Sequence, residues 1–340
     1  MSNKLITFLG CGSWGAALGS ILAEKGFLVR FWHRNQSAIN EMQISRKHYL
    51  LNDINFNKNV SFFSEIDLAV KKANYIVLAV PSQNIREVMM KARKYIEPST
   101  IIINVAKGIE NESLKIMSEV ILDINAEISN YVTLSGPSHA EEVASGMPTA
   151  VVAASNNIDA SKTVQAFFST NKFRVYTNED LIGVEICGSA KNVIAIAAGF
   201  CDGFGYGDNT KSALITRGIK EVARLGLRSG AKLETFFGLA GIGDLIVTCG
   251  SVHSRNRKLG EKIGRGMSLN SAVGESHMVI EGVKSAFSIK SLSEKYEIEM
   301  PICNSVFKVL YENADPVSEV NALMTRNLKS ESFYSSSSSI

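Results

Sequence analysis

A glycine-rich turn, Gly10-Cys11-Gly12-Ser13-Trp14-Gly15, lies between an apolar segment at Leu5–Leu9 and a run of apolar residues at helical spacing. In a strand–turn–helix unit, the first glycine permits the tight turn and the second lets the backbone approach a pyrophosphate. The third glycine lets the helix pack closely on the strand. The helix N-terminus then directs free N–H groups at the anion. The motif therefore predicts a Rossmann-type fold in which Gly10, Gly12 and Gly15 hold a dinucleotide.

Short apolar strands alternate with amphipathic helices through the first half of the chain. Strands are predicted at Leu5–Leu9, 27–32, Val60–Phe63, 75–80, 100–105, 131–134, 149–153 and 173–176. This alternation is typical of βαβ units, which form a mostly parallel sheet with helices on both faces. We therefore assign residues 1–180 to a dinucleotide-binding domain.

The pattern changes after about residue 180, where apolar residues recur at helical spacing. Helices are predicted at 185–200, 214–227, 282–297 and 302–312. Asp208 or Thr210 is expected to cap the second of these helices, and Gly230 to end it. Residues 181–330 are therefore predicted to form an all-helical, substrate-binding domain. Serine dominates the end of the chain, so a disordered tail is predicted at 331–340.

The composition is that of an ordinary globular protein, with 45% hydrophobic and 20% charged residues among 340. A net charge of +3 is too small to predict a nucleic-acid partner. The five cysteines are scattered without a CxxC pair, so neither a disulfide framework nor a metal site is expected. Strongly apolar runs such as 75–80 are too short to cross a bilayer, and no signal peptide is evident. We expect a cytoplasmic protein with no membrane partner.

The end of the second predicted strand, Phe31-Trp32-His33-Arg34, bears on the choice of cofactor. NAD-specific sites usually place an acidic residue here to bind the ribose 2′-hydroxyl, whereas an arginine accommodates a 2′-phosphate. Since the acid is missing and Arg34 is present, the sequence favours NADP without excluding NAD. The alternative is that His33 and Arg34 are only a solvated strand end.

Ligands of open α/β sheets bind beyond the carboxyl ends of the strands, and three loops meet that condition. They are Pro81-Ser82-Gln83, Ala106-Lys107-Gly108 and Ser135-Gly136-Pro137-Ser138. Lys107 is therefore a candidate ligand-binding residue, and Gly136 and Ser138 offer backbone and hydroxyl donors.

Seven strings, in order from about residue 5 to about residue 325, resemble those of the bacterial NAD(P)-dependent glycerol-3-phosphate dehydrogenases. The first is the glycine loop itself. The others are Asn104-Val105-Ala106-Lys107-Gly108-Ile109-Glu110, Leu134-Ser135-Gly136-Pro137-Ser138-His139-Ala140, Gly188-Ser189-Ala190-Lys191-Asn192-Val193-Ile194-Ala195, Gly207-Asp208-Asn209-Thr210-Lys211, Leu239-Ala240-Gly241-Ile242-Gly243-Asp244-Leu245 and Ser254-Arg255-Asn256-Arg257.

This resemblance implies reversible hydride transfer between NAD(P)H and dihydroxyacetone phosphate, giving sn-glycerol 3-phosphate for phospholipid synthesis in a homodimeric enzyme. It implies that Lys191 is catalytic and accepts the proton in the oxidative direction. The substrate contacts that it implies are Lys107, Gly136, Ser138, Lys191, Asp244, Ser254, Arg255 and Asn256. The cofactor contacts that it implies are Ser13, Trp14, His33, Lys107, Ala140, Arg255, Val279 and Glu281.

A lysine is a poor acid–base group at its ordinary pKa of about 10.4, and burial or a nearby ammonium lowers that pKa. Lys191 lies in an otherwise apolar run at 187–200, which suggests burial. We expect Lys107 to be the neighbouring cation and Asp244 to orient Lys191 or the substrate hydroxyl.

The substrate phosphate needs charge-matched donors, which the guanidinium of Arg255 and the amide of Asn256 supply. Arg257 and Lys258 are expected to be surface charges. Two alternative functions share parts of this pattern. A ketopantoate-type reductase would keep the glycine loop and the lysine but not the phosphate donors. A non-catalytic dinucleotide sensor would not need Lys107, Lys191 and Asp244 together.

Overall fold

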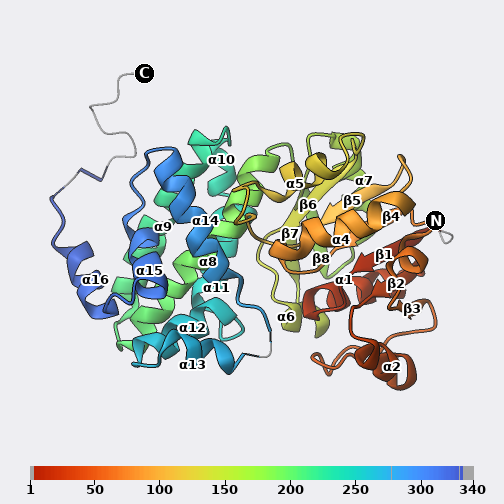
Figure 1. Cartoon of the computed structure of the whole chain (residues 1–340), viewed down its shortest axis with the longest axis horizontal. Helices are drawn as coiled ribbons and strands as arrows, with labels where there is room; N and C mark the ends of the chain where they lie inside the picture. Colours follow the sequence, from red (N-terminus) through yellow and green to blue (C-terminus); the bar gives the residue numbers. More distant parts are fainter. Residues whose placement is uncertain (1–3, 277, 329, 332–340) are drawn as a thin grey trace.

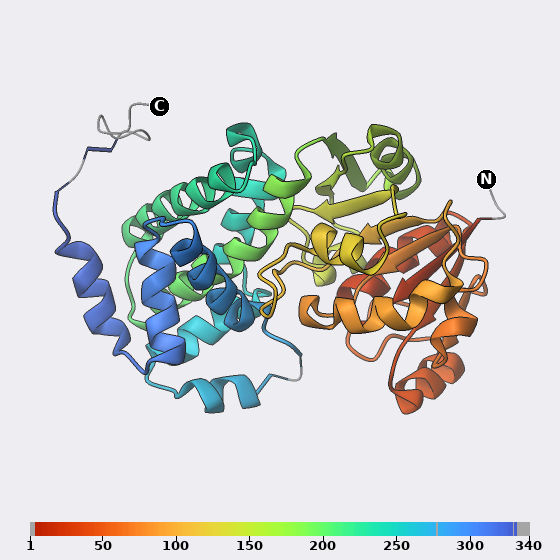
Figure 2. The ribbon, with the colours of Figure 1, turned by 45° about the horizontal axis from the view of Figure 1, so that its top comes forward.

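The computed structural model describes residues 4–276, 278–328, 330 and 331. An eight-stranded sheet flanked by helices forms one half of the molecule, and a group of helices forms the other (Figure 1). Helix α16 lies on the outer side of α15, at the end away from the sheet (Figure 2).

The sheet has the strand order β3-β2-β1-β4-β5-β6-β7-β8. Every neighbouring pair is parallel except β6 and β7, which are antiparallel. The strands are β1 (Leu5–Leu9), β2 (Leu28–Trp32), β3 (Val60–Phe63), β4 (Tyr75–Leu78), β5 (Ile101–Asn104), β6 (Tyr131–Ser135), β7 (Thr149–Ala154) and β8 (Phe173–Asn178).

Both faces of the sheet are covered, which explains why its central strands are apolar at consecutive positions. Val77 packs into the core on one face, and its neighbours Ile76 and Leu78 pack into the core on the other. The helical elements of this half are α1 (Ser13–Glu24), α2 (Gln36–Ser45), α3 (Ile66–Val70), η1 (Ser82–Asn84), α4 (Ile85–Ala92), η2 (Arg93–Tyr95), α5 (Met117–Ile124), α6 (Ala140–Ala144) and α7 (Ile158–Phe168).

The second half is helical throughout its described residues and has its own core. Its elements are α8 (Leu181–Gly203), α9 (Asp208–Arg228), α10 (Leu233–Phe236), η3 (Leu239–Gly243), α11 (Asp244–Gly250), α12 (Arg255–Gly264), α13 (Leu269–Gly274), α14 (Glu281–Lys295), α15 (Pro301–Tyr311) and α16 (Pro316–Met324). The predicted fold class, a mostly parallel Rossmann-type sheet followed by a helical region, is confirmed.

Helix α8 is the central element of this half and nearly all of its residues are buried. It crosses α12 at glycines on both helices, namely Gly199 and Gly203 on α8 and Gly260 and Gly264 on α12. A Cβ at Gly260 would clash with the carbonyl oxygen of Ile196 and lie 3.0 Å from the Cα of Gly199. The two backbones therefore pack directly on each other, which only glycine permits at these positions.

Two segments of the described chain are long and apolar enough to cross a membrane, α8 and Leu233–Gly250. The most apolar window of α8 is 94% buried inside the protein, as expected of a core helix, and the second segment is divided between α10, η3 and α11. The expectation of no membrane partner stays a prediction.

One detail of the predicted helices is wrong. Helix α9 begins at Asp208, its N-cap is Gly207, and no side chain caps it. Asp208 therefore lies inside the first turn. Its negative charge interacts favourably with the helix dipole there, but its carboxylate does not accept a capping hydrogen bond. Most of the predicted tail, residues 332–340, lies outside the described residues. Glu331, the first residue of the predicted tail, is described and forms an ion pair with Arg217 of α9 at 3.3 Å.

Candidate active site

The glycine loop joins β1 to α1 in a conformation that leaves room for a ligand. Gly10 has a φ of +116°, and a Cβ there would lie 2.5 Å from the carbonyl oxygen of Ala79. A Cβ at Gly15 would lie 2.7 Å from the carbonyl oxygen of Gly10. By contrast, a Cβ at Gly12, the N-cap of α1, would meet no atom within 4 Å. The loop is therefore closed on the sheet side and open over the helix N-terminus, which fits a pyrophosphate.

Two other loop residues face the core or the helical half rather than open solvent. Ser13 is buried, with its hydroxyl 4.0 Å from the sulfur of Met278. The Trp14 ring packs against that of Phe173 on β8, with ring centroids 6.4 Å apart. The Trp14 indole N–H is buried and has no hydrogen-bond partner among the described residues.

At the carboxyl end of β2, His33 and Arg34 lie next to the glycine loop. The backbone N–H of Asn35 donates to Nδ1 of His33 at 3.1 Å, which places the proton of a neutral imidazole on Nε2. Burial lowers the pKa of His33, and the charge of Arg34 lowers it further. Arg34 is exposed. This strand end therefore offers one neutral N–H donor and one cation.

Three charged side chains from distant parts of the sequence meet between the two halves. Asp244, at the start of α11, is fully buried and lies between Lys107, in the loop after β5, and Lys191 of α8. Lys107 Nζ donates to Asp244 Oδ2 at 2.7 Å, to the Gly136 carbonyl at 3.0 Å and to Ser138 Oγ at 3.3 Å. Lys191 Nζ donates to the other carboxylate oxygen of Asp244. One carboxylate thus holds two ammonium groups at the carboxyl end of the sheet.

This cluster changes the acid–base behaviour of its members. Burial is the main reason that the pKa of Lys191 falls to about 7, and the charge of Lys107 lowers it further while Asp244 opposes the change. Burial alone would raise the pKa of Asp244, but Lys107 and Lys191 outweigh it and the pKa is lowered. Asp244 is therefore ionised at neutral pH, whereas Lys191 exchanges a proton there.

The N-terminus of α12 places Ser254, Arg255 and Asn256 next to α8, the helix that carries Lys191. Ser254 is the N-cap, and its hydroxyl accepts from the backbone N–H of Arg257 at 3.2 Å. Asn256 Nδ2 donates to the amide oxygen of Asn192 at 2.9 Å, and Asn192 directly follows Lys191 on α8. These contacts tie the N-terminus of α12 to the helix that carries Lys191.

Glu281 links the helical half to the sheet. It starts α14, and its carboxylate accepts from the Ser82 backbone N–H at 3.1 Å and the Ser82 hydroxyl at 2.8 Å. Just before it, the carbonyl of Val279 accepts from Arg255 Nη1 at 2.5 Å. Ala140 is the first residue of α6, in the turn that follows Gly136 and Ser138. The predicted cofactor contacts of the second half thus lie where that half meets the loops of the sheet.

The prediction that Arg257 is a surface charge is wrong. Arg257 Nε lies 2.6 Å from Asp202 Oδ2, its side chain is 14% exposed, and it also pairs with Glu261 at 3.4 Å. The other oxygen of Asp202 pairs with Lys211. Arg257 faces inward because the glycine contact draws α12 onto the end of α8, where Asp202 lies. Lys258, as expected, is exposed.

Sequence reasoning missed two residues of the site, one in the charged cluster and one beside it. Thr248 Oγ1 accepts from Lys191 Nζ at 2.8 Å and donates to the Asp244 carbonyl at 2.6 Å. Its spacing of four residues from Asp244 was a usable signal, because residues at i and i+4 share one face of a helix. Asn192, the hydrogen-bond partner of Asn256, lies inside a recognised motif, but nothing in its residue type or spacing indicated this contact.

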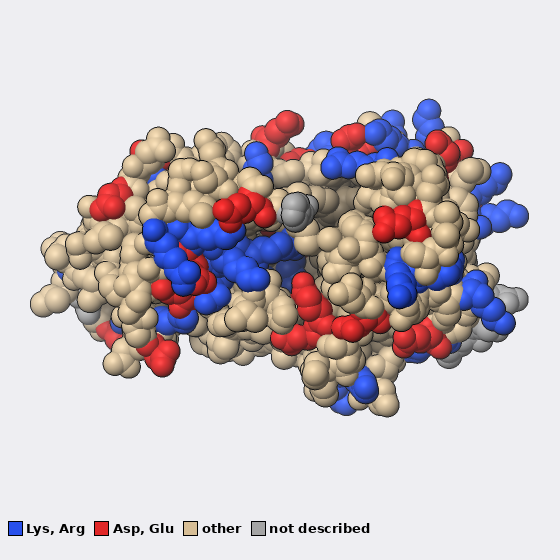
Figure 3. All heavy atoms as spheres, turned by 90° about the horizontal axis from the view of Figure 1, so that it is seen from below, with Lys and Arg blue, Asp and Glu red and all other residues tan. Residues whose placement is uncertain are grey.

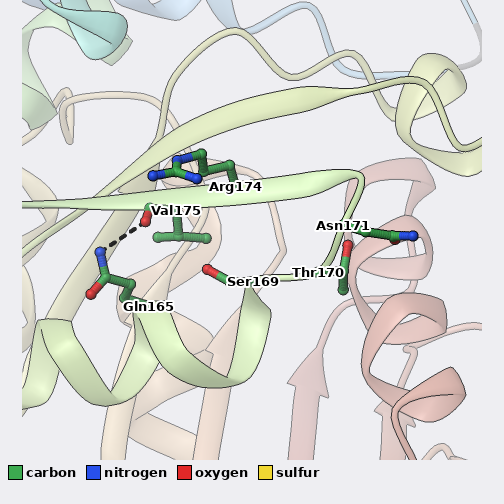
Figure 4. A pocket seen from close by; sticks show the side chains of 6 residues that line it. All are labelled: Gln165, Ser169, Thr170, Asn171, Arg174 and Val175. Atoms are coloured by element: carbon green, nitrogen blue, oxygen red, sulfur yellow. Dashed lines mark hydrogen bonds between the residues drawn. The ribbon is translucent and has the colours of Figure 1, made fainter.

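Two other surfaces lie outside this cluster. A hollow between α7 and β8 is lined by polar groups, and Gln165 Nε2 donates there to the Val175 carbonyl at 2.9 Å (Figure 4). None of the clustered charges lines it. Figure 3, seen from the side of α12 and α13, shows Lys and Arg gathered near the junction of the two halves. Among the described residues, no group of His, Cys, Asp and Glu is placed to hold a metal ion.

Comparison with known proteins agrees with this arrangement. Residues 5–161 match the model of the NAD-dependent glycerol-3-phosphate dehydrogenase N-terminus, and residues 180–321 match that of the C-terminus. A "Glycerol-3-phosphate dehydrogenase [NAD(P)+]" of Clostridium acetobutylicum is 50% identical over 97% of this chain and 99% of its own length. One of Clostridium perfringens is 47% identical over 96% of this chain and 98% of its own length.

Solved structures give the same result. The crystal structure of glycerol-3-phosphate dehydrogenase from Coxiella burnetii superposes with a TM-score of 0.91 at 38% identity, covering 95% of this chain and 99% of that one. A ketopantoate reductase from Ralstonia eutropha has a TM-score of 0.62 at 14% identity, covering 93% of this chain and all of its own, and shares the fold alone. The resemblance predicted from the seven motifs is confirmed, and the chain belongs to the NAD(P)+-dependent glycerol-3-phosphate dehydrogenase family.

Proposed function

We propose that this protein interconverts dihydroxyacetone phosphate and sn-glycerol 3-phosphate with NADPH or NADH. The observation that carries the proposal is the buried Asp244 carboxylate holding Lys107 and Lys191 together. This arrangement places a proton-exchanging amine beside a second lysine side chain, and the reduction of a ketone needs both a proton donor and a group that stabilises negative charge. We further propose that residues 1–180 form the cofactor-binding domain, which also contributes Lys107 to the reaction site, and that residues 181–330 form the substrate-binding domain.

When bound, the nicotinamide would supply or accept the hydride at C2 of the substrate. Lys191 gives a proton to the C2 oxygen in the reductive direction and takes it back in the oxidative direction, for which a pKa of about 7 is suitable. Lys107 stabilises the negative charge that develops on that oxygen. Asp244 and Thr248 hold the Lys191 ammonium in one position, since both accept hydrogen bonds from it.

The substrate phosphate binds at the N-terminus of α12. Arg255 provides a guanidinium there, and the helix N-terminus adds a partial positive charge. Asn256 uses one amide hydrogen on Asn192 and its oxygen on the backbone N–H of Gly282, so one amide hydrogen is left for the phosphate. The Lys and Arg side chains near the junction (Figure 3) favour the approach of an anionic substrate.

An absorbance assay of NADPH and NADH oxidation tests the reaction. Dihydroxyacetone phosphate should be reduced with at least one cofactor, and unphosphorylated dihydroxyacetone should react far more slowly because it lacks the anchoring phosphate. Turnover of unphosphorylated keto acids alone would favour a ketopantoate-type reductase. Cofactor binding without any turnover would favour a dinucleotide sensor.

The pKa of Lys191 predicts opposite pH dependences for the two directions. Oxidation needs the neutral amine, so its kcat/KM should rise with pH and level off above about pH 7. Reduction needs the ammonium form, so its kcat/KM should fall as the pH rises through the same value. Initial rates in both directions between about pH 5.5 and 8.5 measure this. Two profiles that change in the same direction would contradict the role of Lys191.

Arg34 is predicted to distinguish the two cofactors. Replacing it with alanine should weaken NADPH binding about tenfold, because one charge-assisted contact to the 2′-phosphate is lost. NADH lacks that phosphate, so its affinity should change less than about twofold, within experimental scatter. Dissociation constants from fluorescence titration provide the measurement. Equal losses for both cofactors would show that Arg34 does not bind the 2′-phosphate.

The family resemblance also supports the biological setting. We propose that the sn-glycerol 3-phosphate supplies the backbone of phospholipids and that the enzyme works as a cytoplasmic homodimer without a metal, nucleic-acid or membrane partner. Light scattering of the purified protein should give about twice the chain mass of 37.0 kDa.

A further inference from the structure

The loop after α2 is fastened to the glycine loop by a buried histidine. His48 is 3% exposed, and its Nδ1 accepts from the backbone N–H groups of Leu50 at 3.2 Å and Leu51 at 3.1 Å. Nε2 therefore carries the proton and donates to the Cys11 carbonyl at 3.1 Å. On the same side, Met42 of α2 is fully buried with its sulfur 3.7 Å from that of Cys11. This anchoring fixes residues 48–51 relative to the pyrophosphate loop.

Tyr49 follows this anchor but is itself open to solvent. Its side chain is 41% exposed, although its ring lies 4.7 Å from the His48 ring. The His33 ring also lies near it, with ring centroids 6.2 Å apart and an interplanar angle of 65°. The Tyr49 ring therefore contacts two other rings and still presents part of its surface to solvent. It is already positioned for a planar ligand.

We propose that Tyr49, together with His33, forms the binding surface for the adenine ring of the cofactor. In a Rossmann fold the pyrophosphate lies at the N-terminus of α1 and the adenosine ribose lies at the end of β2. His33 directly follows β2, so the adenine that extends beyond that ribose meets the Tyr49 ring. An adenine ring stacks favourably on an aromatic side chain regardless of its hydrogen-bond pattern. This inference rests on the proposed use of NADPH or NADH.

The proposed role of Tyr49 differs from that of Arg34 in a way that binding experiments can measure. Adenine is common to NADPH and NADH, so Tyr49 contributes equally to both cofactors, whereas Arg34 acts on the 2′-phosphate alone. Replacement of Tyr49 with alanine should therefore raise both dissociation constants by the same factor, roughly 5- to 100-fold. Replacement with phenylalanine keeps the ring and should restore binding.

Equilibrium titrations with NADPH, NADH and reduced nicotinamide mononucleotide test the proposal without turnover. The variants are Tyr49→Ala and Tyr49→Phe, with Tyr176→Ala as control, since Tyr176 is 45% exposed on β8 at the opposite edge of the sheet. We expect Tyr49→Ala to lose affinity for both dinucleotides and to keep that for the mononucleotide, which has no adenine. Tyr176→Ala should bind all three like the wild type.

Three results would overturn the inference. The first is NADH binding by Tyr49→Ala within twofold of wild type, and the second is an equal loss of mononucleotide affinity, which would indicate a collapsed loop. The third is failure of Tyr49→Phe to restore binding. If the wild-type protein binds neither dinucleotide, the proposed function fails. If the wild type binds both and Tyr49→Ala binds them equally well, only the role of Tyr49 fails.

Discussion

Replacing Lys191 with methionine is expected to lower kcat by about 10²- to 10⁴-fold while leaving cofactor affinity nearly unchanged. The substitution removes the only group in the cluster whose pKa is shifted to about 7, so proton transfer at the C2 oxygen loses its donor and acceptor. Methionine keeps most of the side-chain volume in the buried α8 position. Asp244 retains Lys107 as its partner, so its charge stays compensated.

Steady-state kinetics with dihydroxyacetone phosphate, together with cofactor titration and thermal unfolding, measures this effect. Lys284→Met is the matched control, because Lys284 is an exposed lysine of α14, and its kcat should equal that of the wild type. A kcat for Lys191→Met within tenfold of wild type would remove Lys191 from the proposed acid–base role. If Lys191→Met is unfolded at the assay temperature, Lys191→Gln is measured in its place.

Replacing Gly260 with alanine is expected to lower the free energy of unfolding by about 1–3 kcal/mol. The added methyl group would clash with the Ile196 carbonyl oxygen and lie 2.9 Å from its carbon, so α8 and α12 must move apart. Backbone atoms give way less readily than a flexible side chain. Because α12 carries Arg255 and Asn256 at its N-terminus, the same shift should raise the KM for dihydroxyacetone phosphate.

Urea unfolding of the wild type and the variant provides the stability measurement. Gly274→Ala is the control, since Gly274 is the last residue of α13 and a Cβ there meets no atom within 4 Å. Its midpoint should be unchanged or slightly higher, because alanine restricts the unfolded chain more than glycine does. If Gly260→Ala unfolds at the same urea concentration as Gly274→Ala, the close glycine contact between α8 and α12 is not needed for stability.

Local sequence signals predicted those elements whose structure depends on nearby residues. Every strand of the sheet was predicted within a few residues, because short apolar runs bounded by glycine, proline or helical periods leave few alternatives. The cap of α9 was wrong because the two predicted caps, Asp208 and Thr210, lie only one and three positions after the actual N-cap, Gly207. Such a difference is decided by how the preceding turn enters the helix. Arg257 was misplaced because it lies in a run of polar and charged residues, and its partner Asp202 lies on another helix.

By itself, the sequence determined the fold class and the family, since the glycine loop and the ordered motifs are local strings that can be recognised one at a time. Only the tertiary structure decided which charges act together. Asp244 lies 137 positions from Lys107 and 53 from Lys191, and Tyr49 meets His33 through the anchoring of His48 to the glycine loop. Contacts between such distant segments depend on how sheet and helices pack, and that packing also buries Lys191 enough to bring its pKa to about 7.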